Sequence, residues 1–245
     1  GVTRREGEEA DDAAPAVNGA GELALIREAP DRVVVVSSGL ETVLFEHGQE
    51  LLDGSVIDRI DRPHPDIDGT GRVAFTGTLD SAPGLMCADR IWLSGPADPI
   101  FVDWGQSLDP ACSFNGLDPV VPLASNDQGS VAYVGTFYAP AESDSFVDAV
   151  FADGAVVWDE RVEGFPPFEF ILDVAINDLG TVAFLHRSAP SSQALYLGPD
   201  PVADKVIATG DALCGATVLG LSFHRYGLND MDEIALLAQL SDART

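Results

Sequence analysis

The sequence predicts an all-β fold, and three observations lead to that prediction. A short turn that opens with Asn or Asp and has Gly, or once Asp, three residues later comes before an apolar stretch at five places along the 245 residues. A second phrase, an apolar stretch that ends at a glycine, alternates with the first. No segment keeps the 3.6-residue apolar period of an amphipathic helix, so we expect few helices. Short strands separated by Gly, Asn, Asp and Pro turns fit all three observations.

The recurring turn sets the length of the unit. The glycine position of the turn is occupied by Gly21, Gly71, Gly129, Gly180 and Asp232, at spacings of 50, 58, 51 and 52 residues. An Asn or Asp that opens such a turn can accept hydrogen bonds from the backbone two residues on, and glycine supplies a positive φ before the strand. We therefore interpret the turn as a folding device rather than as a ligand site.

Each unit has room for about four short strands. The strand after the turn is expected at residues 22–26, 72–79, 130–137, 181–188 and 233–240. The next strand is expected at residues 32–38, 90–95, 148–154 and 194–200. The phrase that ends at a glycine covers residues 2–7, 42–48, 99–105, 158–164 and 205–210. A more variable strand, as in residues 168–177 and 218–229, leads into the turn.

Four strands in a unit of roughly 40–50 residues, repeated along the chain, are typical of a β-propeller. The prediction is a single domain over residues 1–245, a propeller of about five blades. Four blades plus an extra strand is the alternative. In the five-blade interpretation, the strand at residues 234–240 joins the blade that holds residues 2–5 and closes the ring.

The composition excludes several classes of function. Hydrophobic residues make up 46% of the chain, and 40 acidic against 13 basic residues give a net charge of −27. So acidic a protein is not expected to bind nucleic acid or an anionic membrane surface. No apolar run approaches the ~18 residues of a membrane span, so we expect no membrane insertion. We expect a monomer, and no signal peptide is recognised at the start of this chain.

These repeated phrases resemble the bacterial tandem-repeat proteins that carry the repeat Asn-x-x-Gly-x-x-x-Phe and end in a choice of surface anchors. Arg5-Glu6-Gly7 and Thr209-Gly210-Asp211 are similar to the Arg-Glu-Gly-Asp phrase of that family. The resemblance implies an exported, extracellular or cell-surface bacterial protein with a propeller-like β fold. It implies no known reaction. The chain departs from the family pattern at Asp68 and Asp232, and an anchor is not recognised.

Two features of the sequence bear on metal binding and on disulfide formation. Asp66 and Asp68 have the start of a calcium-binding loop, in which alternate aspartates supply oxygen ligands. The twelfth position of that loop would be Gly77 rather than glutamate, so a capped turn is the main interpretation, and no cofactor other than calcium is expected. Cys87 and Cys112 could form one disulfide, against buried thiols as the alternative, and Cys214 is left over.

The expected function is a non-catalytic binding or structural module. Its candidate ligand-binding residues are His47, Trp104 and Glu163, which stand directly before the glycine of the second phrase on a solvent-facing rim. Trp104 would be a stacking platform for a protein or glycan ligand. The alternative is a carbohydrate hydrolase, since two carboxylates around a central channel could act as acid and base. Its candidates are Glu6, Glu46, Asp103, Glu163 and Asp211.

Overall fold

The computed structural model describes residues 15–27, 31–50, 56–60, 65–80, 89–94, 99–102, 114–117, 123–139, 145–162, 168–188 and 192–242. Their regular structure consists of strands, with a single 3₁₀ turn within these ranges. No described helix has the length and apolar character needed to cross a bilayer. The all-β prediction is therefore confirmed.

The strands form five antiparallel sheets within the described ranges, numbered here in chain order. Sheet 1 contains β1 (Ala16–Val17), β2 (Leu23–Arg27), β3 (Arg32–Ser37) and β4 (Leu40–Glu46). Sheet 2 contains β5 (Val56–Ile60), β6 (Asp66–Ile67), β7 (Val73–Asp80), β8 (Asp89–Ser94) and β9 (Pro99–Val102). Sheet 3 contains β10 (Phe114–Leu117), β11 (Ala124–Ser125), β12 (Val131–Ala139), β13 (Ser145–Ala152) and β14 (Ala155–Asp159).

Sheet 4 contains β15 (Phe168–Ile176), β16 (Val182–Ser188), β17 (Ser192–Leu197) and β18 (Lys205–Ala208). Sheet 5 contains β19 (Ala212–Leu213), β20 (Ala216–Ser222) and β21 (Leu237–Leu240), with the 3₁₀ turn η1 (Arg225–Gly227) between its two longer strands. The four-stranded antiparallel unit is thus observed directly, in the strand order β1-β2-β3-β4 and β15-β16-β17-β18.

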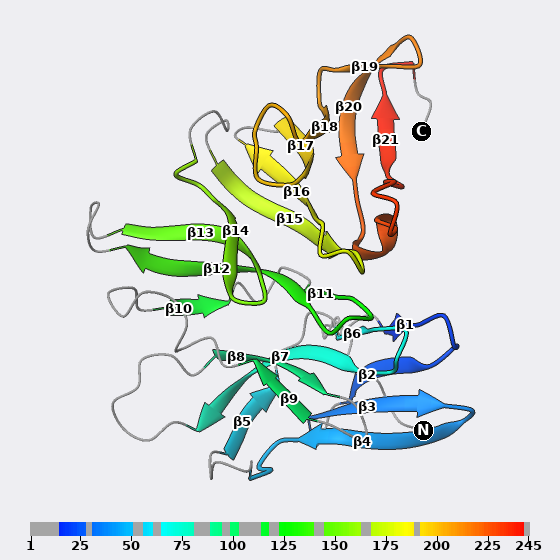
Figure 1. Cartoon of the computed structure of the whole chain (residues 1–245), viewed down its shortest axis with the longest axis vertical. Helices are drawn as coiled ribbons and strands as arrows, with labels where there is room; N and C mark the ends of the chain where they lie inside the picture. The colour runs from blue at the N-terminus through cyan, green and yellow to red at the C-terminus, as the bar shows by residue number, and fades with distance from the viewer. Residues whose placement is uncertain are drawn as a thin grey trace, which may run out of the picture.

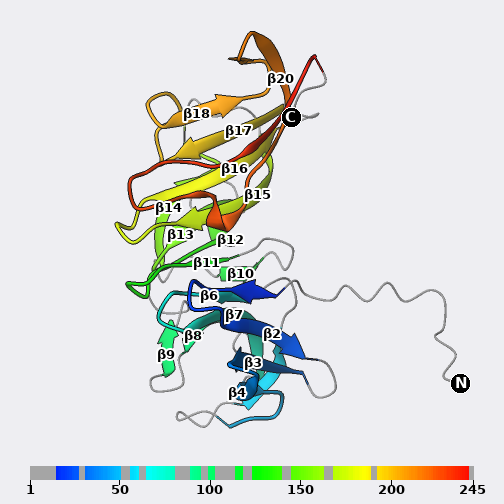
Figure 2. The ribbon, with the colours of Figure 1, turned by 90° about the vertical axis from the view of Figure 1, so that its right-hand side faces the viewer.

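The five sheets follow one another along an arc, from sheet 1 at the bottom of Figure 1 to sheet 5 at the top. Figure 2, turned by 90°, shows the same order from the side. The short strands β1, β6 and β11 and the 3₁₀ turn η1 gather on the inner side of this arc (Figure 1). The expected pairing of residues 234–240 with residues 2–5 cannot be followed, because residues 2–5 lie outside the described ranges.

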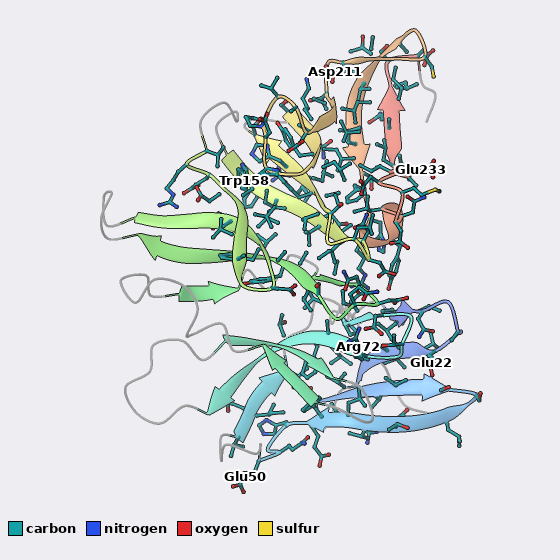
Figure 3. All side chains as sticks on the ribbon, in the orientation of Figure 1. Glu22, Glu50, Arg72, Trp158, Asp211 and Glu233 are labelled. Atoms are coloured by element: carbon teal, nitrogen blue, oxygen red, sulfur yellow. The ribbon has the colours of Figure 1, made fainter. Side chains whose placement is uncertain are left out.

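Sheet 4 shows why the alternating sequences fold in this way. Along a strand, successive side chains point to opposite faces of the sheet. In β16, Val182 and Phe184 pack on the side of sheet 3, where Trp158 of sheet 3 lies 5.5 Å from Phe184 between ring centres (Figure 3). Ala183 and Leu185 pack on the opposite side, in the core that sheets 4 and 5 share. Apolar residues on both faces of β16 therefore contribute to two separate cores.

Candidate functional site

The five recurring turns hold themselves together by the same hydrogen bonds. Turns 1 to 5 are defined as residues 18–21, 68–71, 126–129, 177–180 and 229–232. In each, the Oδ1 atom of the first residue accepts from the backbone N–H groups two and four residues on, at 2.8–3.1 Å. The fourth residue has a positive φ in every turn, from 60° at Asp232 to 89° at Gly129. The internal hydrogen bonds and the positive φ predicted for the turn are confirmed.

The turns also bind one another, which the sequence analysis did not foresee. The side-chain amide of Asn18 donates to the carbonyl oxygen of Asp68 at 3.0 Å. Asn126 donates in the same way to Asn177 at 2.7 Å, and Asn177 to Asn229 at 3.0 Å. A backbone N–H of each of turns 2 to 4 donates to an aspartate of the following turn, and the acceptors are Asp127, Asp178 and Asp230. These bonds join the sheets in chain order along the inner side of the arc.

Turn 2 makes its forward link with different chemistry. Asp68 has no side-chain N–H to donate, but its buried carboxylate holds Arg72 through a 2.6 Å ion pair. The guanidinium of Arg72 then donates to the carbonyl oxygens of Asn126 at 3.3 Å and Asp127 at 2.8 Å. Figure 3 shows Arg72 beside the inner ends of the sheets. The departure from Asn at position 68 is thus compensated by Arg72.

A cavity of about 390 Å³ lies where the five turns meet. Residues from every turn line it, including the aspartates at positions 127, 178 and 230. Arg225 and Tyr226 of η1 and Ser125 of β11 also line it. The cavity wall thus combines polar residues of all five turns with the apolar side chains of Val17, Ile67, Ile176 and Leu228.

Asp66 is the centre of a buried polar cluster behind the cavity wall. Its Oδ1 accepts from the Tyr226 hydroxyl at 3.0 Å, and its Oδ2 accepts from the Ser125 backbone N–H at 2.6 Å and the Ser125 hydroxyl at 2.9 Å. The Arg225 Nε lies 3.3 Å from Oδ1. Burial and the nearby Asp66 carboxylate raise the pKa of Tyr226 to about 12. The cluster ties sheet 5 to sheets 2 and 3 across the arc.

Arg225 is short of acceptors for a buried guanidinium. It is only 6% exposed; its Nε lies 3.3 Å from the Asp66 carboxylate, its Nη1 donates to the Leu123 carbonyl oxygen at 3.4 Å, and its guanidinium also interacts with the Tyr226 side chain. The first of these contacts lacks hydrogen-bond geometry, because the Nε is left without a hydrogen-bond partner. A guanidinium offers five N–H donors, and buried donors are normally satisfied.

Asp173 of β15 is a further buried carboxylate, close enough to Arg225 for their charges to interact. Burial raises its pKa to about 7, and the backbone N–H of Val174 and the charge of Arg225 act in the opposite direction. The carboxyl is therefore part protonated at neutral pH. Asp173 stands four residues before Asn177, and Arg225 stands four residues before Asn229. The two opposite charges thus occupy equivalent positions in sheets 4 and 5.

The residues proposed from the sequence do not gather at one place among the described residues. His47 is exposed, and its Nδ1 lies 2.6 Å from the carbonyl oxygen of Asp58. Trp104 and Glu163 lie outside the described residues, as do Cys87 and Cys112. Cys214 is exposed. The rim site of His47, Trp104 and Glu163 stays a prediction.

The two calcium candidates are both occupied by protein partners. Asp66 binds Ser125 and Tyr226, and Asp68 binds Arg72 and the backbone of its own turn. Among the described residues, no group of three or more His, Cys, Asp and Glu side chains is arranged to hold a metal ion. Carboxylate oxygens already bonded to N–H and O–H donors are poor candidates for Ca²⁺, which takes six to eight oxygen ligands. Calcium binding stays an untested prediction.

Sequence reasoning missed the residues at the centre, namely Arg225, Tyr226 and Ser125. The position four residues before the Asn or Asp of each turn carries a signal in the sequence that indicates such buried polar residues. The fourth position before the turn is Asp173 in sheet 4 and Arg225 in sheet 5, in stretches that are otherwise largely apolar. A charged residue in such a stretch is rarely buried without a partner.

Comparison with known proteins places the chain in one family. A model described as a family of unknown function (DUF7453) matches residues 8–245. The chain belongs to this family. The family description states no activity, ligand or partner, and no curated protein matches the chain.

Proposed function

We propose that this protein is an exported, non-catalytic binding module with a propeller-like arrangement of sheets, and that the turn-lined cavity binds one residue of a neutral glycan. The arc of antiparallel sheets with their turns on the inner side supports the propeller-like arrangement. The cavity volume of about 390 Å³ lies near the lower end of the usual range for small-molecule sites and suits one sugar unit or two.

The single observation that carries this proposal is the buried guanidinium of Arg225 at the cavity. Its Nε has no hydrogen-bond partner, and its Nη1 donates to the Leu123 carbonyl oxygen at 3.4 Å, at the long end of the hydrogen-bond range. The cavity wall offers the opposite chemistry, because the carboxylates of Asp127, Asp178 and Asp230 accept hydrogen bonds. A sugar hydroxyl both donates and accepts, so a polyhydroxylated ligand can satisfy both kinds of group at once.

The charges around the cavity favour a neutral ligand. An anion would meet the carboxylates of the wall and of Asp66, in a protein whose net charge is −27. A cation would meet the buried positive charge of Arg225. A neutral polyol avoids both repulsions. The half-exposed ring of Tyr226 adds an apolar surface on which a sugar ring can lie.

A carbohydrate hydrolase is the second candidate, and one observation favours it. A general acid that works near neutral pH needs a raised pKa, and the pKa of Asp173 is about 7. Asp173 is not among the residues that line the cavity, however, so a substrate there would not touch it. The binding proposal accounts for more of the cavity wall.

Neutral oligosaccharides on an array test the proposal, followed by calorimetric titration of those that bind. Asp178→Asn keeps an oxygen for the Asp127 N–H but removes the carboxylate from the cavity wall. We expect it to weaken binding by about tenfold, because hydrogen bonds to charged acceptors are the stronger ones. Asp200→Asn is the matched control, since Asp200 also accepts backbone N–H groups but lies outside the cavity lining.

Three results would contradict the proposal: no neutral glycan binds, only acidic glycans bind, or Asp178→Asn binds as well as the Asp200→Asn control. A panel of chromogenic glycosides tests the alternative on the same protein. Hydrolysis that Asp173→Asn abolishes would support the hydrolase instead.

A further inference from the structure

The second residue of each turn lines the cavity, and in three turns its backbone N–H has an acceptor in the next turn. The N–H groups of Gly69, Asp127 and Asp178 each donate to the carboxylate of the second residue of the following turn. The N–H of Gly19 in turn 1 has no such acceptor, because the second residue of turn 2 is Gly69 and has no side chain. Among the described residues it has no other hydrogen-bond partner. Turn 1 therefore presents an open N–H donor at the cavity.

The packing around Gly69 explains why that acceptor is missing. A Cβ atom at position 69 would lie 2.5 Å from the Oδ2 atom of Asp127 and 2.7 Å from its Oδ1 atom, so a side chain does not fit there. Asp127 occupies this space because it accepts the N–H of Gly69. A Cβ atom at Gly19, in contrast, would have no heavy atom within 4 Å. The space beside Gly19 is thus open, and an acceptor for its N–H has to come from outside the protein.

Val17 provides an exposed apolar surface next to the same turn. It comes directly before turn 1, and its equivalents before turns 2 and 4 are Ile67 and Ile176. All three side chains line the cavity, but Ile67 and Ile176 are 3% and 6% exposed, whereas Val17 is 49% exposed. The strand β1, which holds Val17, lies beside β6 on the inner side of the arc (Figure 1). A ligand at turn 1 thus meets a hydrogen-bond donor and an apolar side chain two residues apart.

Turn 5 has an open donor without this apolar neighbour. The N–H of Asp230 also lacks an acceptor within the part of the chain that the structure describes. The residue before turn 5, however, is Leu228, which packs against the core that sheets 4 and 5 share. Turn 1 is therefore the place where an acceptor and an apolar group of one ligand can bind together.

The cavity wall also supplies acceptors. Asp178 and Asp230 each use the Oδ1 atom to accept the N–H of the preceding turn. Their Oδ2 atoms accept from no donor among the described residues. Both residues line the cavity, so a ligand N–H or O–H group can donate to them there.

We propose that the sugar unit bound in the cavity carries an N-acetyl group, an inference that rests on the glycan-binding function proposed above. The carbonyl oxygen of the acetamido group accepts the N–H of Gly19, in place of the carboxylate that turn 2 lacks, and its methyl group lies on Val17. The amide N–H donates to a carboxylate of the wall. A hydroxyl group at the same position could accept the Gly19 N–H but would leave Val17 uncovered. A carboxylate group would be repelled by the acidic wall.

Pairs of neutral sugars that differ only in this group test the inference by calorimetric titration of the full chain. Tri-N-acetylchitotriose and cellotriose have the same β-1,4 linkage, with an acetamido and a hydroxyl group respectively at C2. The methyl glycosides of N-acetylgalactosamine and galactose form a second pair. We expect the N-acetyl member of at least one pair to bind about tenfold more tightly than its partner.

The outcomes distinguish this inference from the proposed function. If no neutral glycan on the array binds, the glycan-binding function itself fails. If neutral glycans bind but those with N-acetyl groups bind no more tightly than their hydroxyl partners, the function stands and the N-acetyl inference is overturned. The same holds if the only glycans that bind lack N-acetyl groups.

Gly19→Pro tests the donor, because proline has no backbone N–H. Gly19 is the second residue of a turn closed by the bond from the Gly21 N–H to the Asn18 carbonyl oxygen, a position that proline favours in common turns. We expect the variant to bind the N-acetyl sugar about fivefold more weakly and the hydroxyl partner unchanged. Gly19→Ala is the matched control, since it keeps the N–H and has room for its methyl group. A Gly19→Pro variant that keeps the full preference for N-acetyl overturns the inference.

Nuclear magnetic resonance of the nitrogen-15-labelled wild type gives a second readout that needs no variant at the donor. The amide proton of Gly19 should move downfield with the N-acetyl sugar and move less with its hydroxyl partner. An amide signal that does not move while the N-acetyl sugar binds overturns the inference, including where Gly19→Pro does not fold or its ring blocks both ligands.

Val17→Thr tests the apolar contact. It should weaken binding of the N-acetyl sugar by about threefold, because a hydroxyl replaces a methyl group on the surface that the acetyl methyl covers. Val156→Thr is the matched control, since Val156 is exposed to a similar extent on β14 and lies outside the cavity lining. Equal binding by the two variants would contradict the placement of the acetyl methyl on Val17.

Discussion

Sheets 4 and 5 share the same turn but place opposite charges next to it. Asp173 and Arg225 stand four residues before Asn177 and Asn229, and both side chains are more than nine-tenths buried. The turns beside them make the same internal hydrogen bonds. The hydrogen bonds within the turn are thus the same in both sheets, whereas the residue four positions before the turn differs in charge. The comparison separates the turn hydrogen bonds, which are common to both sheets, from the charged side chains near the inner side of the arc, which differ between them.

Arg225→Met should produce the largest effect on this comparison. It removes the only cation that the structure places beside the buried Asp66 carboxylate within the described residues. Breaking one side of a buried ion pair costs about 3 kcal/mol of unfolding free energy, because a charge is left without a partner. Urea unfolding measures the loss. Arg27→Met is the control, since its ion pair with Glu41 is exposed and should contribute less than about 1 kcal/mol. Equal losses in both variants would contradict a structural role for Arg225.

Asn177→Asp in turn 4 should lower the free energy of unfolding more than Asn229→Asp in turn 5. Asn177 donates both to the Asn229 carbonyl oxygen and to the Asp232 carboxylate, at 3.0 Å and 2.8 Å. The first variant loses both bonds and sets two carboxylates together, so we expect a loss of about 2 kcal/mol in urea unfolding. The amide of Asn229 bonds only Glu233 at the surface, and its replacement should cost about 0.5 kcal/mol. Similar losses would show that the links between turns do not stabilise the arc.

Asp173→Asn should change how the free energy of unfolding depends on pH, because it removes the titrating carboxyl group of Asp173 in sheet 4. The folded state raises the pKa of Asp173 from 3.8 to about 7, so it binds the proton more tightly than the unfolded chain. This site therefore stabilises the fold at low pH, and the stabilisation falls as pH rises from about 4 to about 7. At pH 8 the variant should be more stable than the wild type, and this difference should shrink as pH falls and vanish near pH 4.

His186 gives the unfolding free energy a pH dependence of the opposite sign. Its contribution cancels when the unfolding free energy of the wild type is subtracted from that of the variant. Burial lowers the pKa of His186 to about 4, so its contribution is lost as pH falls through the range below its usual value of 6.5. Both proteins share this group, so the difference between their stabilities isolates Asp173. A difference that does not change between pH 4 and pH 8 would contradict the raised pKa.

The sequence predicted the parts of this fold that depend on local pattern. The turn that opens with Asn or Asp, together with its following strand, is set by neighbouring residues, and its hydrogen bonds are found at all five positions. The links between turns join residues 50 to 58 positions apart, and no local pattern shows which carbonyl oxygen an amide will reach. Arg72 could have been noticed, because it follows the one turn whose first residue is Asp rather than Asn. The contact between Tyr226 and Asp66 spans 160 residues and could not be predicted from spacing.

The smallest expected effect tests the glycine position of the turn. Asp232 adopts a φ of 60°, where turn 4 has Gly180 at 81°. Asp232→Gly relieves that strain by about 0.5–1 kcal/mol but removes an acceptor of the Asn177 amide, worth about the same. The net change in unfolding free energy should stay within about 0.5 kcal/mol.

The same substitution made in the Asn177→Asp background gives the sharper result. There the carboxylates at positions 177 and 232 repel each other, so Asp232→Gly should stabilise the protein by about 1 kcal/mol. A double-mutant cycle from urea unfolding measures this change of sign. If Asp232→Gly has the same effect in both backgrounds, the two residues are not coupled, and the contribution of the Asn177 amide to the link between turns 4 and 5 rests on the Asn229 carbonyl oxygen alone.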